Sequence, residues 1–237
     1  MLQGALNGGR TRAEHQAVPL TPAELARDAT AAAALGVRSV HLHPRDGAGR
    51  ESLAAADCGA AVQAVRAAVP ALEISLSTRV WITGGDAEQR LALVAGWTAV
   101  PDCASVNVSE PGWQDVVAAL AALGARTEVG LATVADAETF AAAADPTLTA
   151  RCVRVLLEPG EADGAAAVAS ARAMDAVLDA AGIGLSRLDH GAEAATWSVI
   201  DAALERGRAV RVGLEDVLAL RDGRPAAGNA ELLAAVA

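Results

Sequence analysis

Short apolar runs alternate along the chain with longer segments whose apolar residues recur at helical spacing. The runs predict eight strands, at residues 2–6, 37–43, 72–78, 103–108, 127–131, 153–157, 185–188 and 209–213. The helical spacing predicts helices at about residues 22–35, 54–69, 87–95, 111–123, 135–144, 165–181, 192–206 and 229–236. The first helix has the clearest start, because Thr21-Pro22-Ala23-Glu24 has the pattern of a capping box with proline at the first helical position.

Each predicted strand is followed by a predicted helix. This alternation favours parallel strands, since each helix carries the chain back across the sheet. Eight such units in 237 residues predict a (β/α)8 TIM barrel in a single domain, residues 1–237. A doubly wound open sheet is the rival fold, but no strand is followed by the Gly-x-Gly-x-x-Gly pattern of a dinucleotide site. With one Phe and no Tyr, Ala, Val and Leu must fill the interior.

Composition narrows the function classes. The formal net charge of −10 argues against nucleic acid or an anionic membrane as a partner. All 19 basic residues are arginines, so chemistry through a Schiff-base, pyridoxal-phosphate or P-loop lysine is excluded. The three cysteines lack the spacing of a zinc site, and neither a membrane-spanning run nor a signal peptide is visible. We therefore expect a cytoplasmic protein that acts on small molecules.

Polar residues gather at the predicted strand ends, where the active site of a barrel lies. They are Asn7, His41, His43, Ser77, Thr78, Asn107, Ser109, Glu128, Glu158, Asp189, His190, Arg211 and Glu215. Brought together at one mouth, these side chains would form a site. His190 is expected either to line the pocket or to pack in the core.

Two stretches indicate a metal site. His41 and His43 are two residues apart on a strand, so their imidazoles point to the same face, an arrangement that suits a metal such as zinc. In a barrel the eighth strand lies two steps from the second, and alternation places Arg211 and Glu215 on one face of it. Glu215 could supply the third ligand and leave positions open for a substrate oxygen. A buried Arg211 needs a partner, and Asp216 could orient it.

Three stretches resemble the beta-keto acid cleavage enzymes, the family of 3-keto-5-aminohexanoate cleavage enzyme. They are residues 7–11, residues 41–46, and residues 210–216 continued by 228–232. The resemblance implies a zinc-dependent (β/α)8 barrel that condenses a β-keto acid with acetyl-CoA, giving acetoacetate and a new acyl-CoA. It also implies a homotetramer. By motif match the zinc ligands are His41, His43 and Glu215, the catalytic arginine is Arg211, and Asp216 supports that arginine.

The resemblance also suggests substrate contacts, to which strand-end position adds Asn7 and Asn107. The family's serine after the third strand matches Ser77 or Thr78, that after the fourth matches Ser109, and the glutamate of the fifth matches Glu128. The chain departs from the family at two places. The family's glutamate near the first strand has no counterpart, and Ser77-Thr78 are followed by Arg79-Val80-Trp81. Because the family's glutamate contacts the amino group of an amino-keto acid, its absence puts that substrate in doubt.

Two other functions fit the same residues. A metal-dependent aldolase or lyase could use the same two histidines and glutamate, and a non-catalytic barrel could bind a small ligand there. Dependence on an acyl-CoA would distinguish the beta-keto acid cleavage enzyme from an aldolase or lyase. Bound metal would distinguish both enzymes from a non-catalytic barrel. The role of Arg211 is open as well, since a pKa above about 12 makes arginine an awkward base. The family resemblance makes Arg211 the base, with Asp216 polarising it, and the conservative alternative is that Arg211 orients the substrate and stabilises negative charge.

Overall fold

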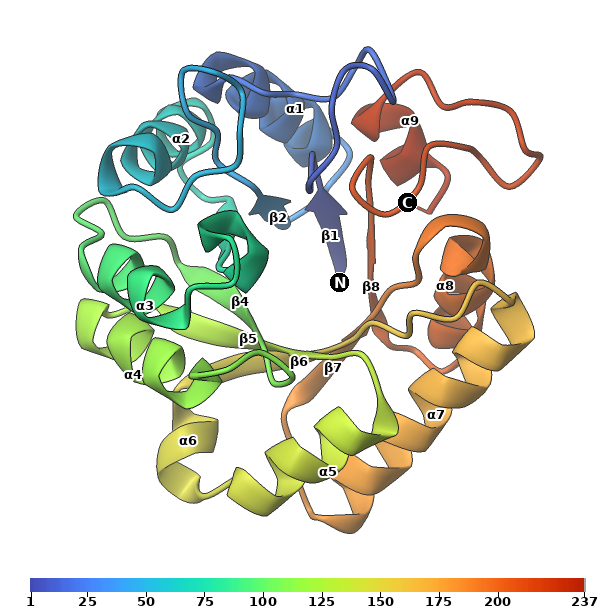
Figure 1. Ribbon diagram of the computed structural model, residues 1–237. Helices are drawn as coiled ribbons and strands as arrows, with labels where there is room; N and C mark the ends of the chain where they lie inside the picture. Colours follow the sequence, from blue (N-terminus) through green and yellow to red (C-terminus); the bar gives the residue numbers. More distant parts are fainter. Residues whose placement is uncertain (237) are drawn as a thin grey trace.

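The computed structural model describes residues 1–236 and shows eight parallel strands closed into a barrel with helices around it (Figure 1). Residue 237, the last of the predicted domain, lies outside the described residues. Neighbouring strands follow one another in chain order, and the last strand pairs with the first. The strands are β1 (Leu2–Ala5), β2 (Ser39–Leu42), β3 (Glu73–Ser77), β4 (Cys103–Asn107), β5 (Arg126–Leu131), β6 (Cys152–Leu157), β7 (Ser186–Asp189) and β8 (Ala209–Val212). The predicted (β/α)8 TIM barrel is confirmed.

The helices form a ring outside the strands. They are α1 (Pro22–Ala34), α2 (Ala55–Ala68), α3 (Ala87–Ala95), α4 (Trp113–Leu123), α5 (Val134–Ala143), α6 (Pro146–Ala150), α7 (Gly164–Ala180), α8 (Thr196–Glu205) and α9 (Asn229–Ala234). The capping box of α1 is present, with Thr21 and Glu24 each accepting from the other's backbone N–H. Two short 3₁₀ helices, η1 (Val80–Thr83) and η2 (Glu193–Ala195), and the short helix α6 are additions to the predicted elements.

Two strand ends differ from the prediction, and both concern the site. β2 ends at Leu42, so His43 lies just beyond the strand rather than on it. β8 ends at Val212, because the chain then turns and the N–H groups of Asp216 and Val217 both donate to the Gly213 carbonyl. Glu215 therefore lies in a turn, and the expectation that it shares a strand face with Arg211 is wrong. The turn still directs its side chain to the mouth of the barrel.

The apolar core lies between the barrel and its helices. Residues such as Val40, Leu42, Ile74 and Val106 belong to one buried cluster with apolar residues of α1, α2 and α4. Ala, Val and Leu do supply most of this layer, as expected. Among the residues the structure describes, no helix is long and apolar enough to span a membrane.

The inside of the barrel is polar, which the composition did not lead us to expect. Gln3 on β1 donates across it to Glu128 on β5, over 2.8 Å. Glu128 also accepts from Arg154 on β6, over 2.7 Å, and from the hydroxyl of Ser75 on β3. These side chains are almost fully buried. The barrel interior is thus held by hydrogen bonds below the site rather than by the apolar layers that usually fill such barrels.

Candidate metal and substrate site

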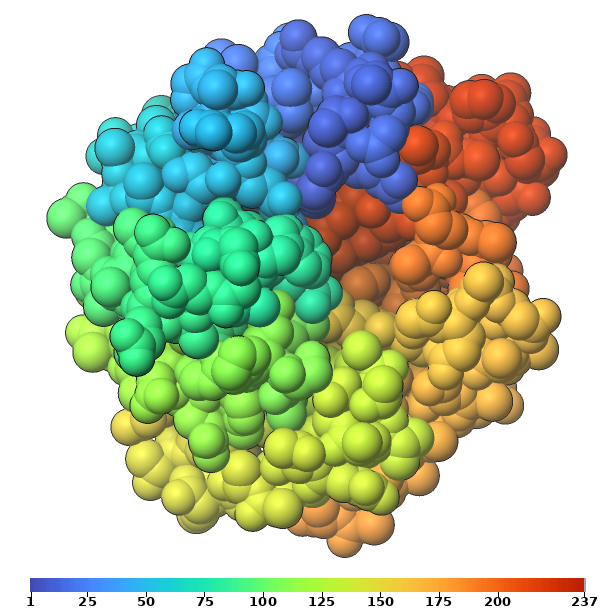
Figure 2. Space-filling model, in the orientation of Figure 1, coloured from blue at the N-terminus to red at the C-terminus, as the bar shows by residue number. Residues whose placement is uncertain are grey.

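A cavity of about 520 Å³ opens at the carboxyl ends of the strands. It appears as a hollow near the centre of the face seen in Figure 2, between the teal segment around residue 80 and the orange segments of the C-terminal half. Its size lies within the range of small-molecule sites. Its charged or titratable lining residues are Arg10, Glu14, His43, Arg79, Glu158, His190, Arg211, Glu215 and Asp216.

Three predicted metal ligands meet beside this cavity, which His43 and Glu215 line. His41, His43 and Glu215 each offer a ligand atom, and these atoms all lie within 4.8 Å of one another. Glu215 Oε1 is 3.5 Å from His43 Nε2, and Glu215 Oε2 is 3.9 Å from His41 Nε2. Both imidazoles are almost fully buried, with exposed fractions of 1% and 2%. Closure of the barrel brings the two histidines next to Glu215, which lies some 170 residues later in the sequence.

Each histidine is held through its other ring nitrogen. His41 Nδ1 lies 3.1 Å from the Ser75 hydroxyl, which itself donates to Glu128, so the hydroxyl oxygen is left to accept from Nδ1–H. His43 Nδ1 lies 2.5 Å from a carboxylate oxygen of Glu51. Both contacts favour the tautomer with the proton on Nδ1 and leave the Nε2 lone pairs facing Glu215. This is the form in which imidazole binds a metal.

The electrostatics of the three residues fit a cation between them. Burial, helped by Arg211, lowers the pKa of His41 to about 3, so its imidazole is neutral. Burial also disfavours the charged form of His43, but the carboxylates of Glu215 and Glu51 outweigh that effect and raise its pKa. Burial opposes ionisation of Glu215 too, yet Arg211 and the two histidines hold its pKa well below the usual range. The site therefore has a carboxylate facing two imidazoles.

One atom among His41, His43 and Glu215 lacks the partner that a bound metal ion would supply. Glu215 Oε2 is buried and has no hydrogen-bond partner among the described residues. An unpaired buried carboxylate oxygen is costly unless a cation or a donor meets it. Gly8 allows Glu215 to lie where it does, because a side chain there would come within 2.4 Å of Glu215 Cγ. Two histidine nitrogens and a carboxylate oxygen are a common zinc donor set, so the residues fit such an ion.

Arg211 joins the three residues to Asp216. Its Nη2 donates to Glu215 Oε1 and to Asp216 Oδ1, both over 2.7 Å, and its Nε lies 3.3 Å from each oxygen of Asp216. The expected pairing of Arg211 with Asp216 is therefore present. Burial alone would lower the pKa of the guanidinium, but the carboxylates of Asp216 and Glu215 outweigh it and raise that pKa. Arg211 is a fixed, positively charged group at the cavity wall.

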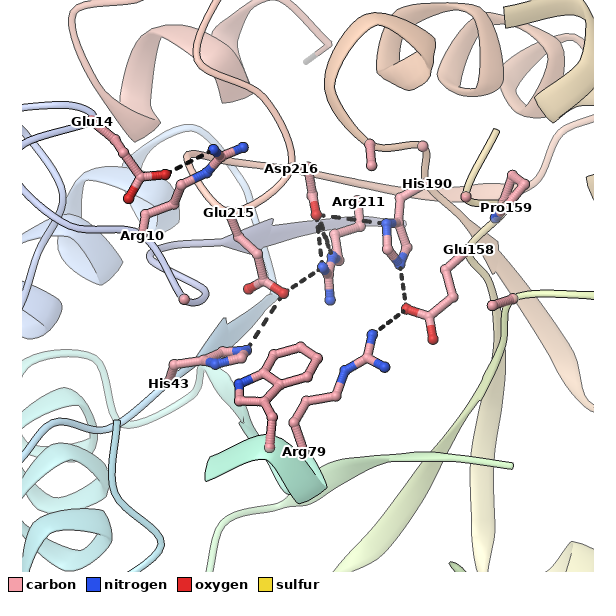
Figure 3. A pocket seen from close by; sticks show the side chains of 16 residues that line it. Arg10, Glu14, His43, Arg79, Glu158, Pro159, His190, Arg211, Glu215 and Asp216 are labelled. Atoms are coloured by element: carbon pink, nitrogen blue, oxygen red, sulfur yellow. Dashed lines mark hydrogen bonds and ion pairs between the residues drawn. The ribbon is translucent and has the colours of Figure 1, made fainter. Parts of the chain in front are cut away.

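The opposite wall carries a second set of charges, seen in Figure 3. His190 lies between Asp216 and Glu158, and Arg79 approaches Glu158 from the other side. Glu158 also accepts from the Asn107 side chain. Burial opposes ionisation of Glu158, but Arg79, His190 and Arg211 together lower its pKa to about 2. This wall is therefore a chain of alternating charges around the imidazole of His190.

None of the six residues predicted to contact substrate lines the cavity. Asn7 is buried and bonds the backbone of His43 and Pro19, so its polar atoms are committed to fixing His43. Ser77 and Thr78 are buried, with the Ser77 hydroxyl 3.3 Å from the Arg79 N–H and that of Thr78 donating to the Ser105 carbonyl. Asn107 holds Glu158, and Ser109 is exposed beyond β4.

Two strand-end assignments need correction. Glu128 lies in the middle of β5 and points across the barrel interior, because its carboxylate pairs with Arg154. Asp189, the last residue of β7, lines a small cleft between α7 and α8 with residues such as Ala171 and Val199. It faces the helices rather than the mouth, as alternation requires of the residue next to His190.

The site also contains residues that were assigned no role from the sequence, namely Glu51 beside His43, and Arg10, Glu14, Arg79 and Trp81 in the cavity lining. Trp81 lies over His43, with ring centroids 6.5 Å apart and planes 25° from parallel, and its indole N–H donates to Glu51 over 3.1 Å. Glu51 returns to the site because the turn at residues 46–49 lets Arg45 and Glu51 form an antiparallel bridge. The Asp46-Gly47-Ala48-Gly49 turn was the available signal, since it folds the chain back on itself.

Comparisons with known proteins agree with this geometry. The sequence profile of one family, described as beta-keto acid cleavage enzyme, matches residues 1–237. Among solved structures, the chain is similar to apo ObcA, with a TM-score of 0.77 and 20% identity over 92% of this chain and 61% of that one. A binary complex of ObcA with oxaloacetate gives a TM-score of 0.75, and a ternary complex with a C4-CoA adduct and oxalate gives 0.76. Both are 20% identical and cover 92% of this chain and 62% of those chains. The chain thus spans less than two thirds of the length of these ObcA chains, and at this identity the likeness shows the fold.

Proposed function

The chain belongs to the beta-keto acid cleavage enzyme family, and we propose that it transfers the acyl group of a β-keto acid to CoA, using acetyl-CoA as co-substrate. In the overall reaction the bond between C2 and C3 of the keto acid breaks. C2 and its carboxylate join the acetyl group to give acetoacetate, and the acyl group passes to the CoA sulfur. The ObcA complexes support this substrate class, since oxaloacetate has a keto group β to one carboxylate and a C4-CoA adduct was bound to the same protein.

The observation that carries the proposal is the meeting of His41, His43 and Glu215 beside Arg211, with His41 buried behind the cavity that the other three line. We propose that the three residues hold a divalent metal, zinc by the family resemblance. Such an ion, when bound, would act as a Lewis acid toward the keto and carboxylate oxygens of the substrate. The unpaired Oε2 of Glu215 and the two Nε2 atoms that face the Glu215 carboxylate support this assignment.

Arg211 is proposed to stabilise negative charge rather than to remove a proton. A guanidinium whose pKa is raised by two carboxylates has no lone pair to accept a proton. It can still donate to an oxygen on which charge develops when C2 loses its proton. Asp216 and Glu215 hold the guanidinium in one orientation, which avoids reorganisation during the reaction. Asp216 is thus a positioning residue for Arg211.

The proposal is tested by following acetoacetate from a panel of β-keto acids with acetyl-CoA. Metal-loaded wild-type protein should form acetoacetate, whereas His41→Ala should lose both bound metal and product. His15→Gln is the matched control, because His15 lies in a loop and bonds the backbone carbonyl of Ala226. Stoichiometric metal in His41→Ala would sink the metal site. Keto acid cleavage without acetyl-CoA would instead identify an aldolase or lyase, and ligand binding with no turnover a binding protein.

We also propose that the protein works as a homo-oligomer, a tetramer by the family resemblance. The barrel exposes a few large apolar side chains, including Leu35 on the loop after α1 and Leu204 on α8. Light scattering at micromolar concentration checks the proposal. A monomer under those conditions would contradict it.

A further inference from the structure

Arg79 is the least closely paired of the three arginines that line the cavity. Its side chain is 27% exposed, its Nη2 lies 3.4 Å from Glu158 Oε2, and its Nη1 lies 3.9 Å from Glu110 Oε1. Arg10 and Arg211 each donate instead to two carboxylates, at 3.1 Å or less. A guanidinium has five N–H donors, and within the described residues Arg79 makes a side-chain hydrogen bond through Nη2 alone. Donors of Arg79 therefore remain for a ligand in the cavity.

Both carboxylates near Arg79 have other partners. Glu158 accepts from the Asn107 side chain. Glu110 pairs with Arg90, whose side chain is fully buried. The positive charge of Arg79 is thus only partly matched by the protein, and an anion that enters the cavity can pair with it.

The Trp81 ring places Arg79 at a substrate's length from the proposed metal site. The Arg79 guanidinium carbon is 4.8 Å from the centroid of this ring, and the His43 ring centroid is 6.5 Å from it. The guanidinium and the His43 imidazole therefore lie no more than about 11 Å apart, and both line the cavity (Figure 3). A β-keto acid with its keto group beside His43 would extend its other end along Trp81 toward Arg79.

We propose that Arg79 is a specificity-determining residue that binds a second carboxylate at the far end of the substrate, so that the enzyme acts on β-keto dicarboxylic acids. This inference rests on the proposed function and deepens it by naming the substrate class. A guanidinium suits such a group, because its planar N–H donors match the two oxygens of a carboxylate. Contact with the Trp81 ring limits the orientations that the guanidinium can take.

The same cavity disfavours an ammonium group at that end of the substrate. Four carboxylates line it, and each already accepts from an arginine or asparagine side chain; they are Glu14, Glu158, Glu215 and Asp216. An ammonium group beside Arg79 would also meet a like charge, which is unfavourable. The cavity is therefore built for an anionic rather than a cationic far end.

The test compares kcat/KM for 3-oxohexanedioate and 3-oxohexanoate, which differ only in that a methyl group replaces the second carboxylate. Metal-loaded wild type should prefer the diacid by about 10- to 100-fold, the usual effect of a hydrogen bond between charged groups. Arg79→Gln should reduce this preference to less than threefold and leave kcat/KM for the monoacid within threefold of wild type. Arg66→Gln is the matched control, because Arg66 lies on α2 and pairs with Asp102 outside the cavity. It should keep the wild-type preference.

Arg79→Lys separates recognition of charge from a structural role. It keeps a positive charge, so it should prefer the diacid more strongly than Arg79→Gln does, and equal preferences in the two variants would contradict the proposal. A wild-type preference below threefold would overturn it without any variant. The phosphates of acetyl-CoA are the other anions in the reaction. A KM for acetyl-CoA that rises more than threefold in Arg79→Gln, with the diacid preference unchanged, would assign Arg79 to CoA and overturn the proposal.

Failure of this inference can be told apart from failure of the proposed function. If wild type forms no acetoacetate from any keto acid, the proposed function fails. Calorimetry with the same two acids then still tests Arg79. Tighter binding of the diacid that is lost in Arg79→Gln supports the carboxylate site, and equal binding of the two acids to wild type removes it.

Discussion

At the scale of single residues, the site depends on how two carboxylates share one guanidinium. Arg211 donates through the same nitrogen to Glu215 and to Asp216, so the two carboxylates hold one cation between them. A buried cation is stable only when it is paired in this way. The arrangement therefore serves the structure of the site and leaves Arg211 charged for the reaction.

Replacing Arg211 by Gln should leave the barrel folded with bound metal and lower turnover by about 100-fold or more, because a charge-stabilising group is lost from the transition state. Arg211→Lys should not restore activity, since an ammonium cannot reproduce the planar pairing with Asp216. Asp216→Asn should fall between wild type and Arg211→Gln. Steady-state kinetics and elemental analysis check these expectations. Turnover near the wild-type value in Arg211→Gln would place Arg211 in structure rather than chemistry.

Asp189 gives a prediction about stability and pH. Burial beside α7 and α8, only partly offset by Arg206 and Arg208, raises its pKa to about 6. The folded state holds this proton more tightly than the unfolded chain does. The resulting contribution to the free energy of unfolding is fully present below the pKa of the unfolded chain and is lost as the pH rises through the folded-state value of about 6. The free energy of unfolding of wild type should therefore fall relative to Asp189→Asn between about pH 4 and pH 7. A shift of about 2 pKa units corresponds to roughly 3 kcal/mol. Urea unfolding across this range checks it, and parallel curves for the two proteins would contradict it.

At the scale of elements, the segment after β2 supplies the carboxylate that holds His43, a proposed metal ligand. Its turn brings Glu51 back beside Arg45, where the carboxylate reaches His43 Nδ1. Glu51→Gln should weaken metal binding about 10- to 100-fold, the usual cost of removing such a partner. Glu88→Gln, on the exposed face at the start of α3, is the charge-matched control and should bind metal as wild type does. Competition with a chelator measures both affinities, and equal values would remove Glu51 from the site.

Gly213, which directly follows β8, lies so close to the backbone of β1 that no side chain fits there. A Cβ there would lie 1.9 Å from the backbone carbonyl oxygen of Ala5, so β1 or the turn that carries Glu215 would have to move. Overpacking of this kind costs about 1–3 kcal/mol or more. Gly47→Ala is the matched control, since a Cβ at Gly47 meets nothing within 4 Å. Gly213→Ala should unfold at lower urea concentration than wild type, and unfolding midpoints equal in both variants would refute the close approach.

The strands were predictable in number and order but not at their ends. Alternating apolar runs placed all eight strands, because each is buried on the face that meets the helices. The same reasoning failed at Glu215, since periodicity continues in the sequence after the backbone has turned at Gly213. The short helix α6 was missed although Asp145-Pro146 is a helix start, because five residues are too few to show a helical period.

At the scale of the whole molecule, ring closure explains why the meeting of His41, His43 and Glu215 could be predicted and the rest of the cavity lining could not. Closure puts β8 beside β1 and thus Glu215 near His41 and His43, whatever the side chains in between. Which strand face points inward is harder to read, because parallel strands are buried on both faces. Glu128 was therefore predicted to contact substrate, although its carboxylate pairs with Arg154 inside the barrel. For the same reason Arg79, His190 and Trp81 were assigned no catalytic role.

The central claim is that this barrel joins C2 of a β-keto acid to the acetyl group of acetyl-CoA. Tracing a ¹³C label from the carbonyl carbon of acetyl-CoA tests it most directly, with ¹³C NMR of the products from metal-loaded protein. The account predicts that the label appears at the keto carbon of acetoacetate in wild type and stays in acetyl-CoA in His41→Ala. Label that remains in acetyl-CoA, or appears in free acetate, while wild-type protein consumes the keto acid would contradict it.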